Sequence, residues 1–145
     1  MSPELRRSLD LIRTTLPPDK PWWIIGSTAL YLSGVAVEAR DVDVYGPLPV
    51  IEAARQALGV PVSPPRADAR FRSSPYFQHR PQDGLEIDFM GGLQVFSGGE
   101  WRELQIESNI WIEGVRVPTL SEQAAILRRF GRPKDLQRLT LIESA

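Results

Sequence analysis

The sequence predicts an α+β protein in which a small mixed sheet is flanked by helices. Apolar residues recur at helical spacing near both ends of the chain, and two short segments between them alternate acidic with apolar residues, as half-buried strands do. At 145 residues and 42% hydrophobic composition, the chain has the size and apolar content of one domain. We therefore expect residues 1–145 to form a single domain, of which residues 118–145 could be a small C-terminal helical part.

A helix, a strand and a second helix are expected to open the chain. Apolar residues at helical spacing predict a helix over residues 3–16, which a pair of prolines ends. Residues 22–25 have the pattern of a short buried strand that stops at Gly26. Ser27 and Thr28 then form a natural N-cap for the second helix.

The rest of the chain alternates strand patterns with chain breakers until two helices close it. We expect a strand at 41–45, a helix at 49–58, a loop at 61–75, strands at 76–80, 85–90, 107–113 and 115–117, and helices at 122–130 and 134–142. Glycine pairs at 91–92 and 98–99 are expected to interrupt the chain. This order of elements is typical of a mixed α/β or α+β domain.

Composition excludes several kinds of site. The chain has no cysteine and one histidine, His79, so disulfides, thiolate metal sites and a multi-histidine zinc site are excluded. A net charge of −1 gives no general attraction to nucleic acid or to an anionic membrane. No apolar run approaches the roughly 18 residues of a membrane span, so we expect a cytoplasmic protein with no membrane partner. The remaining groups favour a hard cation held by oxygen ligands.

Paired acids mark two of the predicted strands. Asp41 and Asp43 project from one face of the first strand because side chains alternate, and their Cα atoms are about 6.6 Å apart. Glu86 and Asp88 share a face of the later strand in the same way. If the strands pair, three or four acids converge, and such a patch suits one or two Mg²⁺ or Mn²⁺ ions. Each pair taken alone is also compatible with solvated residues on the outer face of a strand.

Gly26 and Ser27 lie between a predicted strand and a predicted helix. Glycine lets the backbone approach a ligand closely, and free N–H groups at the start of a helix attract anions. Ser27 adds a hydroxyl donor, so the turn suits a phosphate group. An ordinary helix cap explains a lone Gly-Ser pair equally well. The combination with the acidic strands matches the requirements of metal-assisted nucleotidyl transfer, which needs one part for the triphosphate and others for the metal.

The motifs in this order resemble those of the nucleotidyltransferase superfamily, which has the polymerase-beta-like fold. Its motif of an apolar residue, glycine and serine, followed by acid-apolar-acid, matches residues 25–27 and, thirteen residues later, residues 41–43. The third acid of that family, on a later strand, matches Asp88. Residues 131–136 resemble the Arg-x-Lys-Asp element of the AbiEii-like or minimal nucleotidyltransferase branch, which includes toxins of toxin–antitoxin and phage-defence systems. The resemblance covers residues 22–139.

The resemblance implies a site and a reaction. Asp41, Asp43 and Asp88 would be both the catalytic residues and the metal ligands. The nucleotide would be held by Gly26, Ser27, Lys134 and Arg128. Arg128 or Arg129 would take the place of a lysine that the branch usually carries. The implied activity transfers a nucleoside monophosphate from an NTP to a hydroxyl on a protein, a tRNA or a small molecule.

One alternative keeps the fold without the catalysis. The missing lysine, together with Arg138 where the branch tends to carry an aspartate, favours a nucleotide-binding or partner-binding module that acts with a small partner protein. Four arginines near the proline-rich segment could grip a triphosphate, although a solvated loop is the preferred interpretation there: Arg66, Arg70, Arg72 and Arg80.

Overall fold

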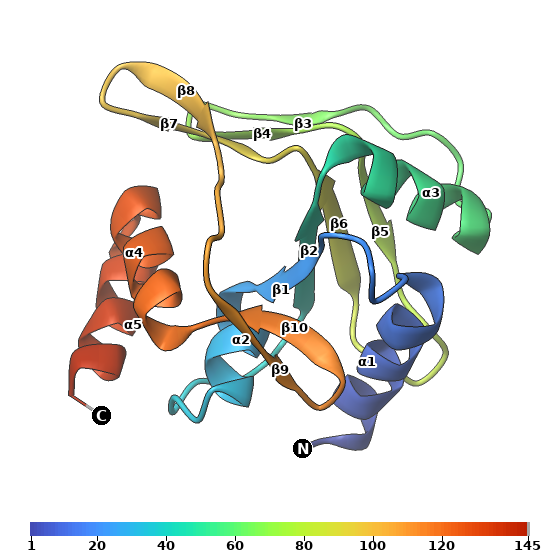
Figure 1. Ribbon diagram of the computed structural model, residues 1–145, viewed down its shortest axis with the longest axis horizontal. Coiled ribbons are helices and arrows are strands. Elements are labelled where there is room, and N and C mark those ends of the chain that lie inside the picture. Colours follow the sequence, from blue (N-terminus) through green and yellow to red (C-terminus); the bar gives the residue numbers. More distant parts are fainter. Residues whose placement is uncertain (145) are drawn as a thin grey trace.

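The fold is built on a central four-stranded sheet, seen in a computed structural model that describes residues 1–144 (Figure 1). Its strands are β1 (Trp23–Ile25), β2 (Val42–Gly46), β6 (Ile87–Gly91) and β5 (Tyr76–His79), in the spatial order β1-β2-β6-β5. β2 and β6 are parallel, whereas β1 and β5 pair antiparallel with their neighbours. The sheet is therefore mixed, as the sequence predicts.

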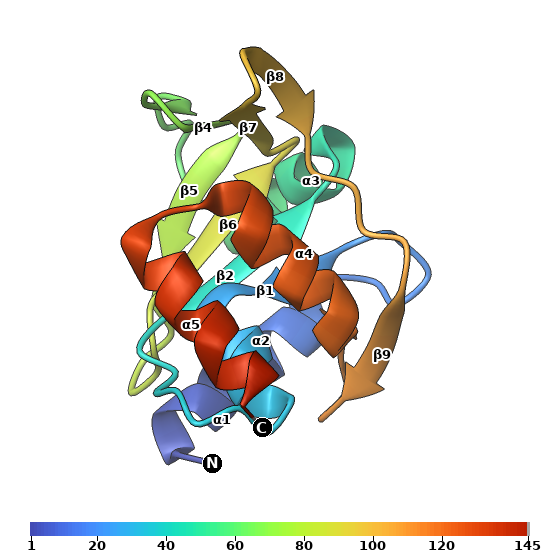
Figure 2. The same ribbon diagram turned by 90° about the vertical axis from the view of Figure 1, so that its left-hand side faces the viewer.

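Helices cover both faces of this sheet. On one side lie α1 (Pro3–Thr15) and α3 (Leu48–Leu58), and on the other α4 (Leu120–Phe130) and α5 (Pro133–Glu143), which cross in front of the sheet in Figure 2. Val44 and Phe89 are fully buried in the core cluster shared with α1 and α3. Tyr45 and Met90, the next residues along, pack in a second cluster with Phe130 of α4. Alternation along the strands thus assigns successive side chains to opposite layers.

The first helix follows its sequence signals closely. Ser2 accepts a hydrogen bond from the backbone N–H of Leu5 at 3.1 Å, and Leu16 is the C-cap residue. Leu5, Leu9 and Ile12 are buried in the core at helical spacing. The predicted helix over residues 3–16 is confirmed to within one residue.

The second helix begins differently from the prediction. α2 (Gly26–Leu32) starts at Gly26 with Ile25 as its N-cap, and no side chain caps it. Thr28 is fully buried and its hydroxyl donates to the backbone oxygen of Asp41 at 2.6 Å. The prediction that Ser27 and Thr28 cap this helix is therefore wrong, because the hydroxyl of Thr28 ties α2 to the start of β2 instead.

A second four-stranded sheet lies at one end of the first. It consists of β3 (Arg66–Ala67), β4 (Phe71–Ser73), β7 (Gln94–Ser97) and β8 (Glu100–Glu103), in the order β3-β4-β7-β8. Two predictions are corrected here. The segment 61–75 is not all loop, since β4 pairs with β7 more than twenty residues later. The glycine pair 98–99 is the turn of the hairpin β7-β8, whose strands sequence patterning missed.

The other predicted elements are present. The strands predicted at 107–113 and 115–117 are the hairpin β9 (Asn109–Ile112) and β10 (Val115–Pro118). α4 begins two residues before its predicted start because Thr119 caps it, accepting from the N–H of Glu122 at 3.4 Å. α4 ends at Phe130, its C-cap residue Gly131 has a left-handed backbone conformation, and α5 follows directly. Within residues 1–144, no helix combines the length and apolar character needed to cross a membrane.

A buried serine fixes α1 to the chain entering β6. The Ser8 hydroxyl is inaccessible to solvent, donates to the backbone oxygen of Leu85 at 2.7 Å and accepts from its N–H at 2.8 Å. We expect Ser8→Ala to lower the free energy of unfolding by about 1–3 kcal/mol, because two backbone groups lose their partner. Thr14→Ala, an exposed hydroxyl on the same helix, should change it by less than about 0.5 kcal/mol. Urea unfolding curves of both variants measure the difference, and equal effects would contradict the role given to Ser8.

Candidate functional site

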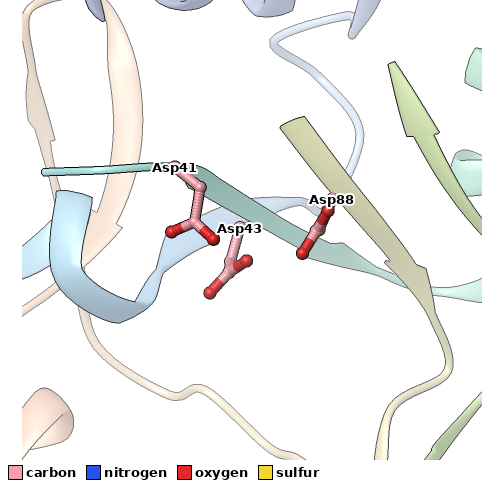
Figure 3. A group of neighbouring side chains, drawn as sticks. All are labelled: Asp41, Asp43 and Asp88. Atoms are coloured by element: carbon pink, nitrogen blue, oxygen red, sulfur yellow. The ribbon is translucent and has the colours of Figure 1, made fainter. Parts of the chain in front are cut away.

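The register of two parallel strands brings the predicted acids together. β2 and β6 pair Asp43 with Asp88, and both side chains leave the sheet on the face opposite to Val44 and Phe89. Asp41 immediately precedes β2 and projects toward the same space (Figure 3). One carboxylate oxygen from each of the three lies within 4.8 Å of the others. The structure therefore gathers three acids from two chain segments into one group.

The fourth acid considered in the sequence lies outside this group. Glu86 precedes β6, and its backbone oxygen accepts from the N–H of Val42 at 2.9 Å, which extends the parallel pairing. Among the described residues, only Asp41, Asp43 and Asp88 form a cluster with metal-ligand spacing. Of the three or four acids expected to converge, three therefore do so.

Burial and neighbouring acids raise the pKa of two of the three carboxyl groups, those of Asp43 and Asp88. The pKa of Asp43 is raised to about 7, mainly because the group is buried and also because Asp41 and Asp88 are close, while Arg66 and Lys134 act in the opposite direction. The pKa of Asp88 is also raised, again chiefly by burial, although a hydrogen bond from Gln78 at 2.9 Å lowers it. Three ionised groups at this spacing repel, and a divalent cation held by their oxygens removes that cost. The donor set therefore fits Mg²⁺ or Mn²⁺.

Gly26 is the residue that makes room for this group. Its φ is +74°, and a Cβ added there would lie 2.7 Å from Oδ2 of Asp43. The preceding residue, Ile25, is the register partner of Asp43 across β1 and β2. A side chain at position 26 would thus be strained and would also collide with the central acid.

The acids open into a cavity of about 200 Å³. Its lining combines acidic, basic and apolar side chains from both layers of the fold. The polar and charged ones are Ser27, Asp41, Asp43, Arg66, Asp88, Gln123, Arg132, Lys134, Asp135 and Arg138. The apolar ones include Ile25, Leu30, Ile126, Leu127 and Phe130. The cavity thus lies between the sheet and the helices α4 and α5.

Three of the four residues predicted to bind the nucleotide lie at the cavity. Gly26, Ser27 and Lys134 line the cavity beside the acids, as the sequence suggested. Arg128 is not among the lining residues; its guanidinium lies on the surface, 3.3 Å from a carboxylate oxygen of Glu143. The structure therefore does not bring Arg128 to the site. The sequence predicted that Arg66 lies in a solvated loop, but Arg66 lines the cavity. It does so because β3 pairs with β4 instead of extending into solvent.

Sequence reasoning gave no role to two lining residues, Arg132 and Gln123. The Arg132 side chain bonds twice to the buried carboxylate of Asp135, at 2.6 and 3.0 Å, and its guanidinium lies over the Phe71 ring, 4.9 Å from the centroid. In the sequence, the Arg-Pro-Lys-Asp segment was the pattern that could have indicated a role for Arg132. Gln123 carried no signal in the sequence, because a single glutamine on a helix is ordinary.

The raised pKa of Asp43 predicts how metal-free stability depends on pH. An aspartate with a pKa of 3.8 when unfolded and about 7 when folded costs stability as pH rises between these values, since only the unfolded chain releases the proton. With EDTA present, Asp43→Asn should therefore melt at a higher temperature than the wild type, by an amount that grows from pH 5 to pH 8. A change of about 1 kcal/mol corresponds to roughly 2–4 °C.

Thermal melts followed by circular dichroism measure this effect. Asp19→Asn, an exposed aspartate that does not line the cavity, is the matched control and should show no such growth. An Asp43→Asn variant less stable than the wild type at pH 8 would contradict the electrostatic account.

The contact between Gly26 and Asp43 gives a second prediction. Gly26→Ala should weaken Mg²⁺ or Mn²⁺ binding by about 10–100-fold, the usual effect of disturbing the surroundings of a metal ligand. Gly34→Ala is the control, because Gly34 has φ +89° but no atom within 4 Å of its added Cβ. Both variants carry backbone strain and only the first displaces Asp43. Titration of Mn²⁺ by electron paramagnetic resonance measures the difference, and equal affinities would refute the role of Gly26.

Among solved structures, the chain is similar to a crystal structure of a candidate nucleotidyltransferase from Thermotoga maritima. The two superpose with a TM-score of 0.73 over 92% of this chain and 89% of that chain, at 20% sequence identity. No protein-family model matches the chain, and no curated protein matches it significantly. At this identity the likeness establishes the fold. The predicted α+β class is confirmed, and the chain has a nucleotidyltransferase-type fold with three converging aspartates.

Proposed function

We propose that the protein is a metal-dependent nucleotidyltransferase that moves a nucleoside monophosphate from an NTP to an acceptor hydroxyl. The observation that carries the proposal is the group formed by Asp41, Asp43 and Asp88, whose oxygens meet within 4.8 Å on a cavity wall. The fold shared with a candidate nucleotidyltransferase supports the same class of reaction.

The acids suit a divalent cation in their chemistry as well as their spacing. Carboxylate oxygens are the ligands that Mg²⁺ prefers, and the burial of Asp43 makes an uncompensated negative charge there unfavourable. The chemistry that a bound Mg²⁺ or Mn²⁺ supplies is neutralisation of phosphate charge and activation of the acceptor hydroxyl. Asp41 and Asp43 would hold the cation that accompanies the triphosphate, and Asp88 would share a second one.

The remaining residues bind and orient the reactants. Gly26 and Ser27 would contact the β- and γ-phosphates through backbone N–H and hydroxyl groups, and the positive charges of Lys134 and Arg66 would offset phosphate charge. Asp88 is oriented by its hydrogen bond from Gln78. It would either accept the proton of the acceptor hydroxyl or act as a ligand of the cation that activates this hydroxyl. A new bond then forms between that oxygen and the α-phosphorus, the bond to the β-phosphate oxygen breaks, and pyrophosphate leaves.

Several finer expectations stay predictions. They are the AbiEii-like branch, a role in a toxin–antitoxin or defence system, a small partner protein, a cytoplasmic location and the identity of the acceptor. Arg128 leaves the proposed nucleotide site because it lies outside the cavity, whereas Lys134 stays. One observation favours the non-catalytic alternative: Arg138, which stands where the resembled branch tends to carry an aspartate, faces the same cavity.

Label transfer separates the two possibilities. The full chain is incubated with Mg²⁺ or Mn²⁺, each α-³²P-labelled NTP, and a total protein and RNA extract, beside Asp41→Asn/Asp43→Asn and the control Asp19→Asn. We expect label to move to an acceptor with the wild type and the control, and to fall to background with the double variant.

Two other results are informative. Metal-dependent NTP binding without any transfer would identify a binding module. Transfer that persists in the double variant would contradict the assignment of the acids.

A further inference from the structure

Aromatic and basic side chains alternate in a row between the central sheet and the end of α4. The guanidinium of Arg66 lies over the ring of Tyr76, 5.9 Å from its centroid, and over that of Phe71 at 5.6 Å. The guanidinium of Arg132 lies over the same Phe71 ring at 4.9 Å and over the Phe130 ring at 5.6 Å. Tyr76 belongs to β5, which pairs with β6, whereas Phe130 ends α4. The row therefore leads from the sheet that carries the acids, past Arg66, to Arg132.

A buried carboxylate fixes the guanidinium of Arg132. Asp135 is 1% exposed and accepts three hydrogen bonds from Arg132, from the backbone N–H at 3.1 Å, from Nε at 2.6 Å and from Nη2 at 3.0 Å. The backbone bond satisfies the start of α5, as a helix cap does. The two side-chain bonds go beyond capping, because a paired contact with one carboxylate sets both the position and the plane of a guanidinium.

Part of this guanidinium stays available to a ligand. It has five N–H groups, of which Asp135 takes one on Nε and one on Nη2. Within residues 1–144, the Arg132 side chain makes no other hydrogen bond. The side chain is 28% exposed and lines the cavity. Both donors of Nη1 and the second donor of Nη2 can therefore reach an anion bound there.

The place of Arg132 in the row distinguishes one phosphate of an NTP from the others. The α-phosphorus reacts, so it must lie at the cations that the acids hold. Arg66 is close to these acids, since its charge lowers the pKa of Asp43, which burial raises. Arg132 lies on the other side of Phe71, toward α4. A triphosphate that begins at the acids and follows the row passes Arg66 and ends at Arg132.

We propose that Arg132 binds the γ-phosphate of the NTP and that Asp135 is the positioning residue that orients it. This inference rests on the proposed function, because it concerns the donor substrate of the same site. The planar guanidinium suits paired contacts with the oxygens of a terminal phosphate. An NDP has no phosphate at that place, so the two residues select a nucleoside triphosphate over a diphosphate.

The test compares each of the four NTPs with its NDP, which lacks only the γ-phosphate. Equilibrium binding to the full chain with Mg²⁺ is measured by isothermal titration calorimetry. We expect the wild type to bind at least one NTP about tenfold more tightly than the matching NDP, or better. Arg132→Met, which removes the guanidinium and keeps an unbranched apolar side chain, should weaken that NTP about tenfold and the NDP by less than about threefold.

Asp135→Asn tests the positioning role. Asparagine keeps the shape of the side chain and an oxygen for the start of α5, but it cannot accept the paired contact as a carboxylate does. The variant should weaken the NTP about fivefold and leave the NDP nearly unchanged. Added to Arg132→Met, it should cause no further selective loss, because a residue that acts through Arg132 has nothing left to orient.

Two further variants accompany the comparison. Arg102→Met is the matched control, because Arg102 on β8 also pairs with an acid, Glu100 at 3.0 Å, and does not line the cavity. It should keep the wild-type preference. Circular dichroism checks that each variant is folded. Arg132→Lys keeps the charge but loses the planar fork, and it should still weaken the NTP selectively if Arg132→Met does not fold.

The outcomes separate this inference from the proposed function. A wild type that binds NTP and NDP equally, an unchanged preference in the Arg132 variant, or an equal weakening of both nucleotides overturns the γ-phosphate contact. If nucleotide binding is nevertheless lost in Asp41→Asn/Asp43→Asn, the proposed function survives that result. If neither any NTP nor inorganic triphosphate binds with Mg²⁺, the proposed function falls and the γ-phosphate contact falls with it.

Discussion

The parallel pairing of β2 with β6 is the constraint on which the site depends. In its register Asp43 lies beside Asp88, while Val44 and Phe89 lie together in the core under α1 and α3. Because side chains alternate with a period of two, a slip of one residue would turn an acid toward that core. Burial of the apolar face therefore selects the register, and the register assembles the acids. Core packing and site geometry are two consequences of one alignment.

The same alignment has an electrostatic cost. Asp43 is held among other acids in a half-buried position, and its pKa rises to about 7. Gly26 allows the chain to pass close to this carboxylate, at a φ that other residues avoid. An arrangement that destabilises the metal-free protein makes sense at a site where a cation restores the balance. Functional sites are where such local conflicts are expected.

The sequence predicted the parts of the fold that local patterns determine, and missed those that depend on distant partners. Acid-apolar alternation was sufficient for β2 and β6, and the three acids were correctly expected on one face. β4 and β7 were not predicted, because each strand is short and is stabilised by pairing with the other. The sequence pattern predicted that the hydroxyl of Thr28 caps its own helix. In the structure it donates instead to the backbone oxygen of Asp41, thirteen residues later. Gln123 could not be assigned to the cavity from the sequence, because only the structure shows that its amide group donates to Ser33 and Pro118.

The central claim is that Asp41, Asp43 and Asp88 form one divalent-cation site. A crystal of the full chain soaked with Mn²⁺ and a non-hydrolysable ATP analogue tests it most directly, through the anomalous scattering of manganese. The account predicts an anomalous peak within coordinating distance of oxygens from all three carboxylates, and its loss in Asp43→Asn. Peaks found only elsewhere, or none at the three acids with the nucleotide bound, would contradict it.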